Sequence, residues 1–74
     1  MTALKFGKVR YGLYQAQRDG HYYEIENTGG EGWKTSHGLT AGSTTTEVIE
    51  FGIRRARLAD AKTDAEQHYL GGNG

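Results

Sequence analysis

Three histidines, His21, His37 and His68, are the side chains of this 74-residue chain best suited to proton transfer or metal binding. Helical zinc sites place two histidines four positions apart, and many other zinc sites add cysteines. No two of these histidines have that spacing, and the chain contains no cysteine. The sequence therefore predicts no metal site. We interpret the histidines as solvated, with His68 favourable near the negative end of a helix.

Other groups that resemble catalytic or cofactor-binding motifs lack the context that such chemistry needs. Ser36 and the other hydroxyls have no neighbouring base to activate them. Glu24 and Glu26 share a strand face and resemble a carboxylate pair, but solvated strand residues are the better interpretation. The glycine-rich residues 29–32 lead into Trp33 rather than into a helix, unlike a dinucleotide-binding loop. We therefore expect no enzymatic activity and no cofactor.

The length and composition limit the chain to one small domain. A core of this size supplies only about 3–5 kcal/mol of net stability, and a second copy of the chain would add to it. The absence of cysteine excludes disulfides and is typical of a reducing compartment. No segment approaches the roughly 20 apolar residues of a membrane span. We predict a single cytoplasmic domain, residues 1–74, that does not contact a membrane.

The charge is unevenly distributed although the net charge is zero: residues 1–18 carry +4, residues 19–50 carry −5 and residues 51–74 carry +1. A dedicated nucleic-acid binder usually has a high pI and a basic face, whereas the pI here is near neutral. Nucleic-acid binding is therefore the less favoured alternative, with tyrosines available to stack on bases. Its residues would be Lys5, Lys8, Arg10, Arg54, Arg55 and Arg57.

The clearest local signal is Asp19-Gly20, which supplies the two positive-φ positions of a tight hairpin turn. A two-residue turn pairs Arg18 with His21, Gln17 with Tyr22, Ala16 with Tyr23, Gln15 with Glu24 and Tyr14 with Ile25. One face of the hairpin then holds Tyr14, Ala16, Tyr23 and Ile25. The other face is polar except for Leu13 and Tyr22. The pattern indicates a half-buried antiparallel hairpin.

We expect three antiparallel strands within residues 1–38 and one long helix over residues 44–70. Residues 4–11 either begin the first strand or form a separate edge strand, and residues 33–36 form the third strand. Thr44 and Glu47 match a capping box at the start of the helix. Residues 71–74 form a disordered tail. The fold class is α+β, with the sheet packed against an apolar helical stripe of Ile49, Gly52, Ile53, Ala56 and Ala59.

A second apolar set along the same predicted helix favours self-association. Phe51, Leu58 and Ala65 recur every seven residues, and Tyr69 lies beside them. A helix over residues 45–69 would be about 38 Å long and would extend beyond a domain about 30 Å across, unless it breaks near Lys62. We predict a homodimer interface on this set. The alternative is a wider core face covered by the N-terminal segment.

Leu13 and Tyr22 are the apolar members of an otherwise polar sheet face, and tyrosine is enriched in interface anchors. We therefore predict that these two residues bind an unidentified protein partner. The function that we favour is a small non-enzymatic protein-interaction module, an accessory or regulatory protein that acts by occlusion.

Residues 22–59 carry an architectural resemblance, through Tyr23, Ile25, Gly32-Trp33, Thr44 to Glu47 and Ala56. The order of strands, Asp-Gly turn and Thr-x-x-Glu helix resembles the small β-β-β-α proteins common in actinobacteria and their phages, which implies a phage-encoded accessory protein. It is also similar to the arm-type DNA-binding domains of tyrosine recombinases, but lacks the basic sheet with which those domains read a groove. Neither resemblance assigns a functional residue.

Overall fold

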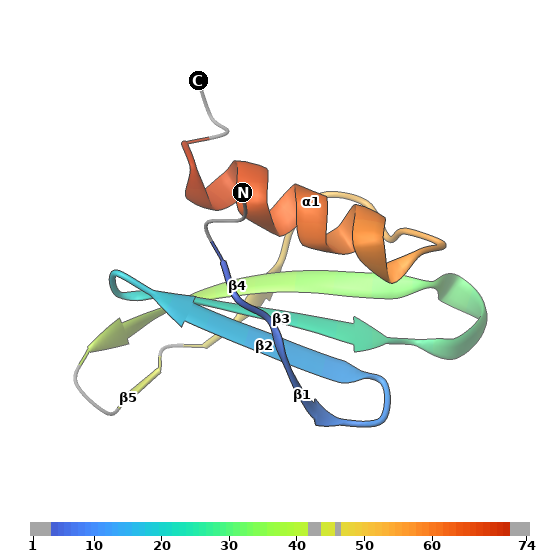
Figure 1. The fold of residues 1–74 in the computed structure, drawn as a ribbon, viewed down its shortest axis with the longest axis horizontal. Helices are drawn as coiled ribbons and strands as arrows, with labels where there is room; N and C mark the ends of the chain where they lie inside the picture. The colour runs from blue at the N-terminus through green and yellow to red at the C-terminus, as the bar shows by residue number, and fades with distance from the viewer. Residues whose placement is uncertain (1–3, 42–43, 46, 72–74) are drawn as a thin grey trace.

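A sheet of antiparallel strands carries one helix across one of its faces (Figure 1). The computed structural model describes residues 4–41, 44–45 and 47–71. The elements in chain order are β1 (Gly7–Arg10), β2 (Leu13–Arg18), β3 (His21–Asn27), the 3-10 turn η1 (Gly29–Glu31), β4 (Trp33–Ala41), β5 (Thr44–Thr45), β6 (Ile49–Glu50) and α1 (Leu58–Tyr69). The α+β class, with an antiparallel sheet and a C-terminal helix, is confirmed.

The hairpin of β2 and β3 has the predicted turn and register. Asp19 and Gly20 adopt φ angles of 52° and 81°, the left-handed conformations that a two-residue turn requires. Arg18 pairs with His21, and the register continues to Leu13 opposite Glu26. Because the register is correct, Ala16, Tyr23 and Ile25 are buried on one face, as predicted.

The sheet is larger than the predicted three strands. Five strands follow the order β1-β2-β3-β4-β5, and the short β6 pairs with a different part of β4. β1 is a separate edge strand with a register shift between Lys8 and Arg10. The third predicted strand continues past Ser36 to Ala41, since its pairing with β3 extends to Leu39 opposite His21. Gly38 therefore lies within a strand and does not end it.

The predicted helix over residues 44–70 is wrong in its first half, because α1 begins only at Leu58. Thr45 lies in β5 rather than in a capping box, and Ile49 pairs with His37 of β4. β-branched residues such as these lose side-chain freedom in a helix and favour strands. Gly52 has a φ angle of 71°, which a right-handed helix excludes. The 12-residue helix is about 18 Å long and runs through Lys62 without a break.

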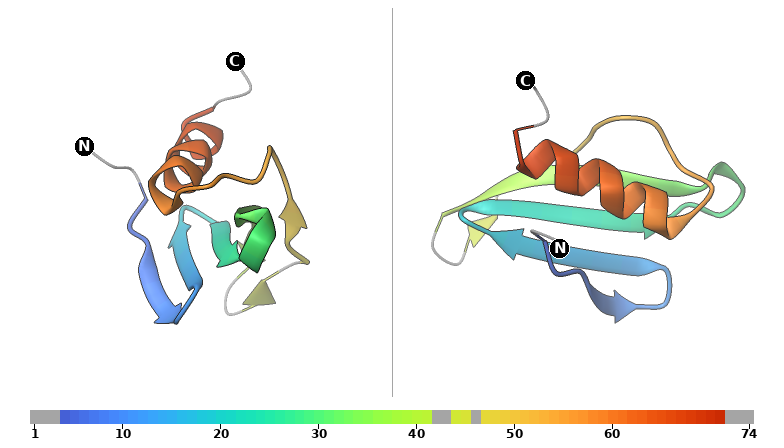
Figure 2. Two further views of the ribbon diagram at one scale, coloured as in Figure 1. Left: turned by 90° about the vertical axis from the view of Figure 1, so that its right-hand side faces the viewer. Right: turned by 45° about the horizontal axis from the view of Figure 1, so that its top comes forward.

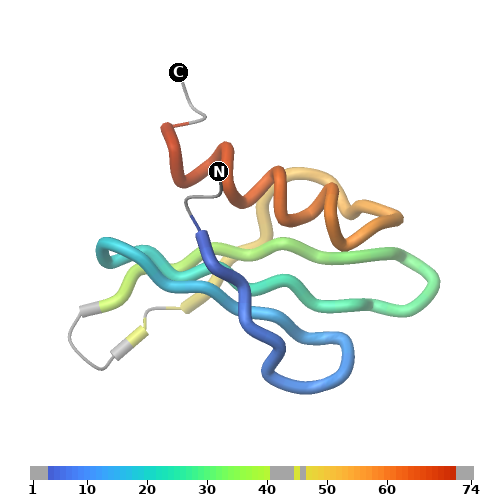
Figure 3. The backbone as a smooth tube through the Cα atoms, in the orientation of Figure 1, coloured from blue at the N-terminus to red at the C-terminus, as the bar shows by residue number. Residues whose placement is uncertain are grey.

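Figure 3 shows how the chain reaches this helix. The segment after β6 crosses to the end of the sheet where β3 turns into β4, so that α1 runs back towards the β2–β3 turn. Backbone hydrogen bonds between Trp33 and Arg55, with N···O distances of 2.7 and 3.1 Å, fix the crossing. Gly71, with a φ angle of 89°, follows the end of the helix as predicted, while residues 72–74 of the predicted tail lie outside the described residues.

The core lies between α1 and the sheet and includes the N-terminal segment. Ala61 and Ala65 are fully buried, so the middle of the helix presents methyl groups to the sheet. Leu4 closes one side, where its backbone N–H donates to Glu66 at 2.9 Å. Figure 2 shows residues 4–6 on one side of the helix and residues 51–57 on the other. The predicted stripe is therefore wrong: Ile49 and Ile53 are exposed and precede the helix.

Candidate interaction site: a histidine and tyrosine cluster

Six aromatic side chains gather where the C-terminal end of α1 meets the β2–β3 turn. This histidine cluster comprises His21, Tyr23, His37, Phe51, His68 and Tyr69. Its members come from β3, β4, the segment after β6 and the helix. Ring centroids lie 4.4 Å apart for Phe51 and His68, and 4.7 Å apart for His37 and His68. Residues far apart in the sequence thus form one packed unit.

The sheet register brings the strand members together. The tight turn places His21 at the start of β3, and Tyr23 follows two residues later on the same face. His37 pairs with Tyr23 across β3 and β4, with ring centroids 4.8 Å apart. His68 and Tyr69 reach the cluster from the last turn of α1, whose buried Ala65 holds the helix against the sheet.

The polar atoms of the cluster bind one another. His21 Nδ1 lies 2.9 Å from His37 Nε2, so one ring nitrogen carries the proton and the other accepts it. The Tyr23 hydroxyl lies 2.7 Å from His68 Nδ1, and the Tyr69 hydroxyl donates to Asp19 in the turn. These hydrogen bonds tie the helix end to the hairpin, and the hairpin to β4.

Burial keeps the inner members of the cluster neutral. It lowers the pKa of His37, and the nearby His68 and His21 lower it further. Burial, with a smaller effect from Tyr69, raises the pKa of Tyr23 to about 12. The pKa of Tyr69 is raised chiefly by its hydrogen bond to Asp19. At neutral pH the centre of the cluster therefore consists of uncharged rings.

The interpretation of the histidines as solvated is wrong for His21 and His37, which are half-buried. Within residues 4–41, 44–45 and 47–71, no group of three or more His, Asp or Glu side chains could hold a metal ion. The signal for the cluster was present in the hairpin register, which places His21 and Tyr23 on the core face. It was missed because ending the third strand at Ser36 left His37 in a loop.

Two exposed aliphatic residues border the cluster on the sheet. Leu39 is 51% exposed and pairs with His21, whereas Ile49 is 68% exposed and pairs with His37. Directly paired residues of antiparallel strands share a face. Leu39, Ile49 and the two histidines therefore form one continuous surface across β3, β4 and β6. We call this the cluster surface.

The residues of the predicted dimer interface lie in different environments. Phe51 precedes the helix and packs against the core, and Ala65 is fully buried. Leu58, the first residue of α1, is half-buried, and Tyr69 belongs to the cluster. The continuous helix on which that interface depended is wrong, and Ala65 faces the sheet. The alternative to a dimer interface is that these residues form a wider core face covered by the N-terminal segment. Their placement corresponds to that alternative, since Leu4 of the N-terminal segment packs against the same core.

The structure also places the predicted partner-binding residues. Tyr22 lies on the sheet face opposite α1 and is only 8% exposed. Its hydroxyl accepts a hydrogen bond from Gln15 Nε2 at 2.8 Å and donates one to Glu24 at 3.2 Å. Leu13 is half-buried at the other end of β2. Tyr22 therefore has little free area with which to anchor a partner.

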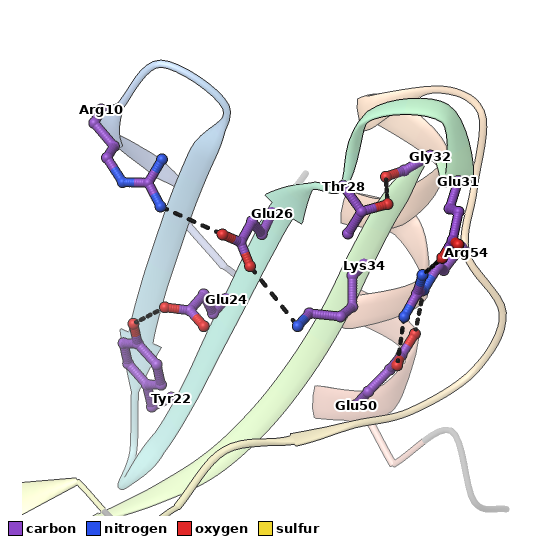
Figure 4. A network of polar contacts seen from close by, with 10 residues as sticks. All are labelled: Arg10, Tyr22, Glu24, Glu26, Thr28, Glu31, Gly32, Lys34, Glu50 and Arg54. Atoms are coloured by element: carbon purple, nitrogen blue, oxygen red, sulfur yellow. Dashed lines mark hydrogen bonds and ion pairs between the residues drawn. The ribbon is translucent and has the colours of Figure 1, made fainter.

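Several of the predicted nucleic-acid-binding residues pair with acidic side chains (Figure 4). Arg10 pairs with Glu26 at 3.3 Å, and Arg54 pairs with Glu31 and Glu50. Arg55 donates two hydrogen bonds to Asp64, at 2.7 and 3.0 Å, outside this view. Glu26 also contacts Lys34 at 3.7 Å, whereas Glu24 accepts from Tyr22, so the two carboxylates have separate partners. Lys5 and Arg57 are exposed, as is Lys8, which lies over the Tyr11 ring.

A groove of about 580 Å³ lies between residues 4–6 and α1. Leu4, Phe6 and Ala59 form part of its apolar lining. Two of its charged groups already have partners, since Glu66 accepts from Leu4 N–H and Lys62 lies over the Tyr14 ring at 5.3 Å, which leaves Lys5 as an exposed charge on its lining. The groove therefore offers few polar groups converging on one point to orient a ligand, and the cluster surface is the better candidate site.

No family model, curated protein or solved structure matches this chain. In the part of the chain that the structure describes, no helix has the length and hydropathy to cross a membrane.

Proposed function

We propose that this protein is a small non-enzymatic protein-interaction module that binds a partner protein with the cluster surface. One observation carries the proposal: Leu39 and Ile49 are exposed beside His21 and His37 on one continuous face of the sheet. Aliphatic side chains next to aromatic rings with polar atoms are typical of the centre of a protein interface. Large exposed apolar residues that adjoin one another mark interaction sites more often than isolated ones.

The packing beneath this surface supports the proposal. Tyr23 is fully buried, and its hydroxyl contacts His68, so the rings beneath Leu39 and Ile49 are held in place before a partner binds. A preorganised surface loses less side-chain entropy on association than a mobile one. The proposal replaces Leu13 and Tyr22 as the partner-binding residues. The proposed function still includes an accessory role, in which the protein acts by covering a surface of its partner. It also still includes a phage origin.

Charge substitution at the cluster surface tests the proposal. We expect Leu39→Asp to abolish binding of a partner captured and identified with the wild-type protein, because a carboxylate would be desolvated without a counter-ion. Ile53→Asp makes the same change at a residue that is 64% exposed in the segment between β6 and α1, and should bind normally. Equal binding by the wild type and Leu39→Asp, with both folded, would exclude this surface.

Nucleic-acid binding is the second candidate, and one feature favours it. Lys8 lies over the ring of Tyr11, which is 87% exposed and could stack on a base. Binding of labelled duplex and single-stranded DNA at low and at physiological salt tests this function. Our proposal predicts at most weak binding that salt abolishes. Binding that persists at physiological salt and is lost in Tyr11→Ala would favour nucleic acid as the ligand.

A further inference from the structure

The two edges of the sheet carry opposite charge. β1 forms one edge and carries Lys8 and Arg10, with Lys5 just before it. The segment of β6 forms part of the opposite edge and carries Glu47 and Glu50. Figure 2 shows β1 and the segment around β5 and β6 on opposite sides of the sheet. The uneven charge along the chain is thus also a separation of charge across the fold.

Both edges are accessible. All four residues of β1 are exposed, including Val9 at 51%. On the other edge Glu47 and Glu50 are exposed, and Ile49 is 68% exposed. An edge strand presents backbone N–H and C=O groups that a strand of another molecule can pair with. Each edge therefore combines an edge-strand backbone, one exposed aliphatic side chain and charged groups that are basic on β1 and acidic on the β6 segment, where Arg54 pairs with Glu50 and leaves Glu47 as the acidic group without an ion pair among the described residues.

We propose that the protein associates head to tail with further copies of itself, with the β1 edge of one copy beside the β6 edge of the next. The symmetric alternatives are disfavoured, because β1 beside β1 places Lys8 and Arg10 against the same cations, and β6 beside β6 places glutamates together. Like charges on facing strands are destabilising and opposite charges are favourable. A head-to-tail contact closes into a ring or continues as an open chain.

Existing ion pairs and the short edge strands limit the strength of the head-to-tail contact. Arg10 already pairs with Glu26, and Glu50 pairs with Arg54. Within the described residues no ion pair involves Glu47, so Lys8 and Glu47 are the charges most available to a second copy. β1 has four residues and a register shift, and β6 has two. Short, irregular and charged edges limit backbone pairing, so the association should be weak, reversible and sensitive to salt.

Sedimentation equilibrium of the full chain tests this inference. We would raise the protein concentration to about 1 mM at low ionic strength, which suits a weak contact with a millimolar dissociation constant. The average mass should then rise above the 8.2 kDa of one chain. It should return to the single-chain value in about 1 M salt, where the screening length falls to about 3 Å. A single-chain mass at every concentration would overturn the inference, as would a dimer that salt does not weaken.

Charge reversal then distinguishes head-to-tail association from any other contact. Lys8→Glu and Glu47→Lys should each weaken self-association by about fivefold, the upper effect of losing one exposed ion pair. An equal mixture of the two variants should restore it, since each acidic edge again meets a basic one. Lys62→Glu changes the net charge as Lys8→Glu does, but on α1, and should have no such effect.

Failure of the mixture to recover would overturn the edge assignment, provided that circular dichroism shows both variants folded. If either charge reversal unfolds the chain, the neutral variants Lys8→Gln and Glu47→Gln replace the two reversal variants. Unchanged self-association in both neutral variants would overturn the edge assignment. The two proposals share Ile49, but Leu39 belongs to the cluster surface alone, so Leu39→Asp should abolish partner binding and leave the sedimentation result unchanged.

Discussion

The two ends of α1 are attached to the sheet by different chemistry. At the N-terminal end, backbone hydrogen bonds between Arg55 and Trp33 and a partly exposed ion pair between Arg55 and Asp64 hold the chain. At the C-terminal end, His68 and Tyr69 pack into uncharged rings that are linked by hydrogen bonds. The difference implies that backbone geometry and salt control the first end, whereas packing and pH control the second.

The largest effect should come from the centre of the C-terminal end. Tyr23→Ala removes a fully buried ring that contacts His37, Phe51 and His68. Such truncations cost about 3–5 kcal/mol, as much as the whole stability expected of so small a core. We expect urea denaturation to find this variant largely unfolded. Tyr23→Phe keeps the ring, and its loss of about 1 kcal/mol would measure the hydroxyl contact with His68 alone.

A backbone substitution should disrupt the N-terminal end. Gly32 has φ and ψ angles of 90° and −157°, and a Cβ atom there would lie 2.5 Å from the Arg55 carbonyl oxygen. We expect Gly32→Ala to lower the free energy of unfolding by about 3 kcal/mol, because this conformation is essentially restricted to glycine. Gly29→Ala is the control, since its φ angle is 80° but no atom lies within 4 Å. Equal losses in the two variants would exclude the close contact as the cause.

Acidification should weaken the C-terminal end selectively. The pKa of His37 in the folded chain lies below its ordinary value of 6.5, so near that pH the unfolded chain binds a proton that the folded chain does not. Stability is therefore retained above pH 6.5 and is lost as the pH falls through the lower folded pKa. The urea midpoint of the wild type should fall over this range, and that of His37→Gln should fall less. If the urea midpoints of the wild type and His37→Gln fell in parallel with pH, His37 would not be the group responsible.

The smallest effect should come from the ion pair at the N-terminal end. Asp64→Asn removes the charge that accepts two hydrogen bonds from Arg55. Because the pair is partly exposed, we expect a small loss of stability that disappears in concentrated salt. A loss as large as that of Gly32→Ala would show that the ion pair, rather than the backbone contact, holds this end.

Sequence reasoning succeeded where a local rule decides the structure. The Asp19-Gly20 turn sets the register of β2 and β3, and that register placed Tyr23 and Ile25 in the core. It failed over residues 44–57, where a capping-box pattern and good helix formers suggested a helix. Pairing of β6 with Ser36 and His37, and the positive φ angle of Gly52, determine that segment instead. Such long-range pairing has no signature within the segment itself.

The same error hid the candidate site. A strand that ended at Ser36 left His37 in a loop, and a helix from residue 44 placed Phe51 on an exposed stripe. In the fold both rings join His68, which is distant in sequence, and only the complete sheet brings them together. Histidine spacing along the chain carried no information about this contact, because the three rings come from three different elements.

The most direct test is an NMR titration of the imidazole nitrogens, since the cluster surface depends on a packed cluster with a neutral His37 at its centre. We predict that His37 at pH 7 is neutral, in a single tautomer fixed by its contact with His21, and that it titrates below its ordinary pKa of 6.5. Independent titration of the three rings near the ordinary value, with averaged tautomers, would show solvated histidines and contradict the cluster.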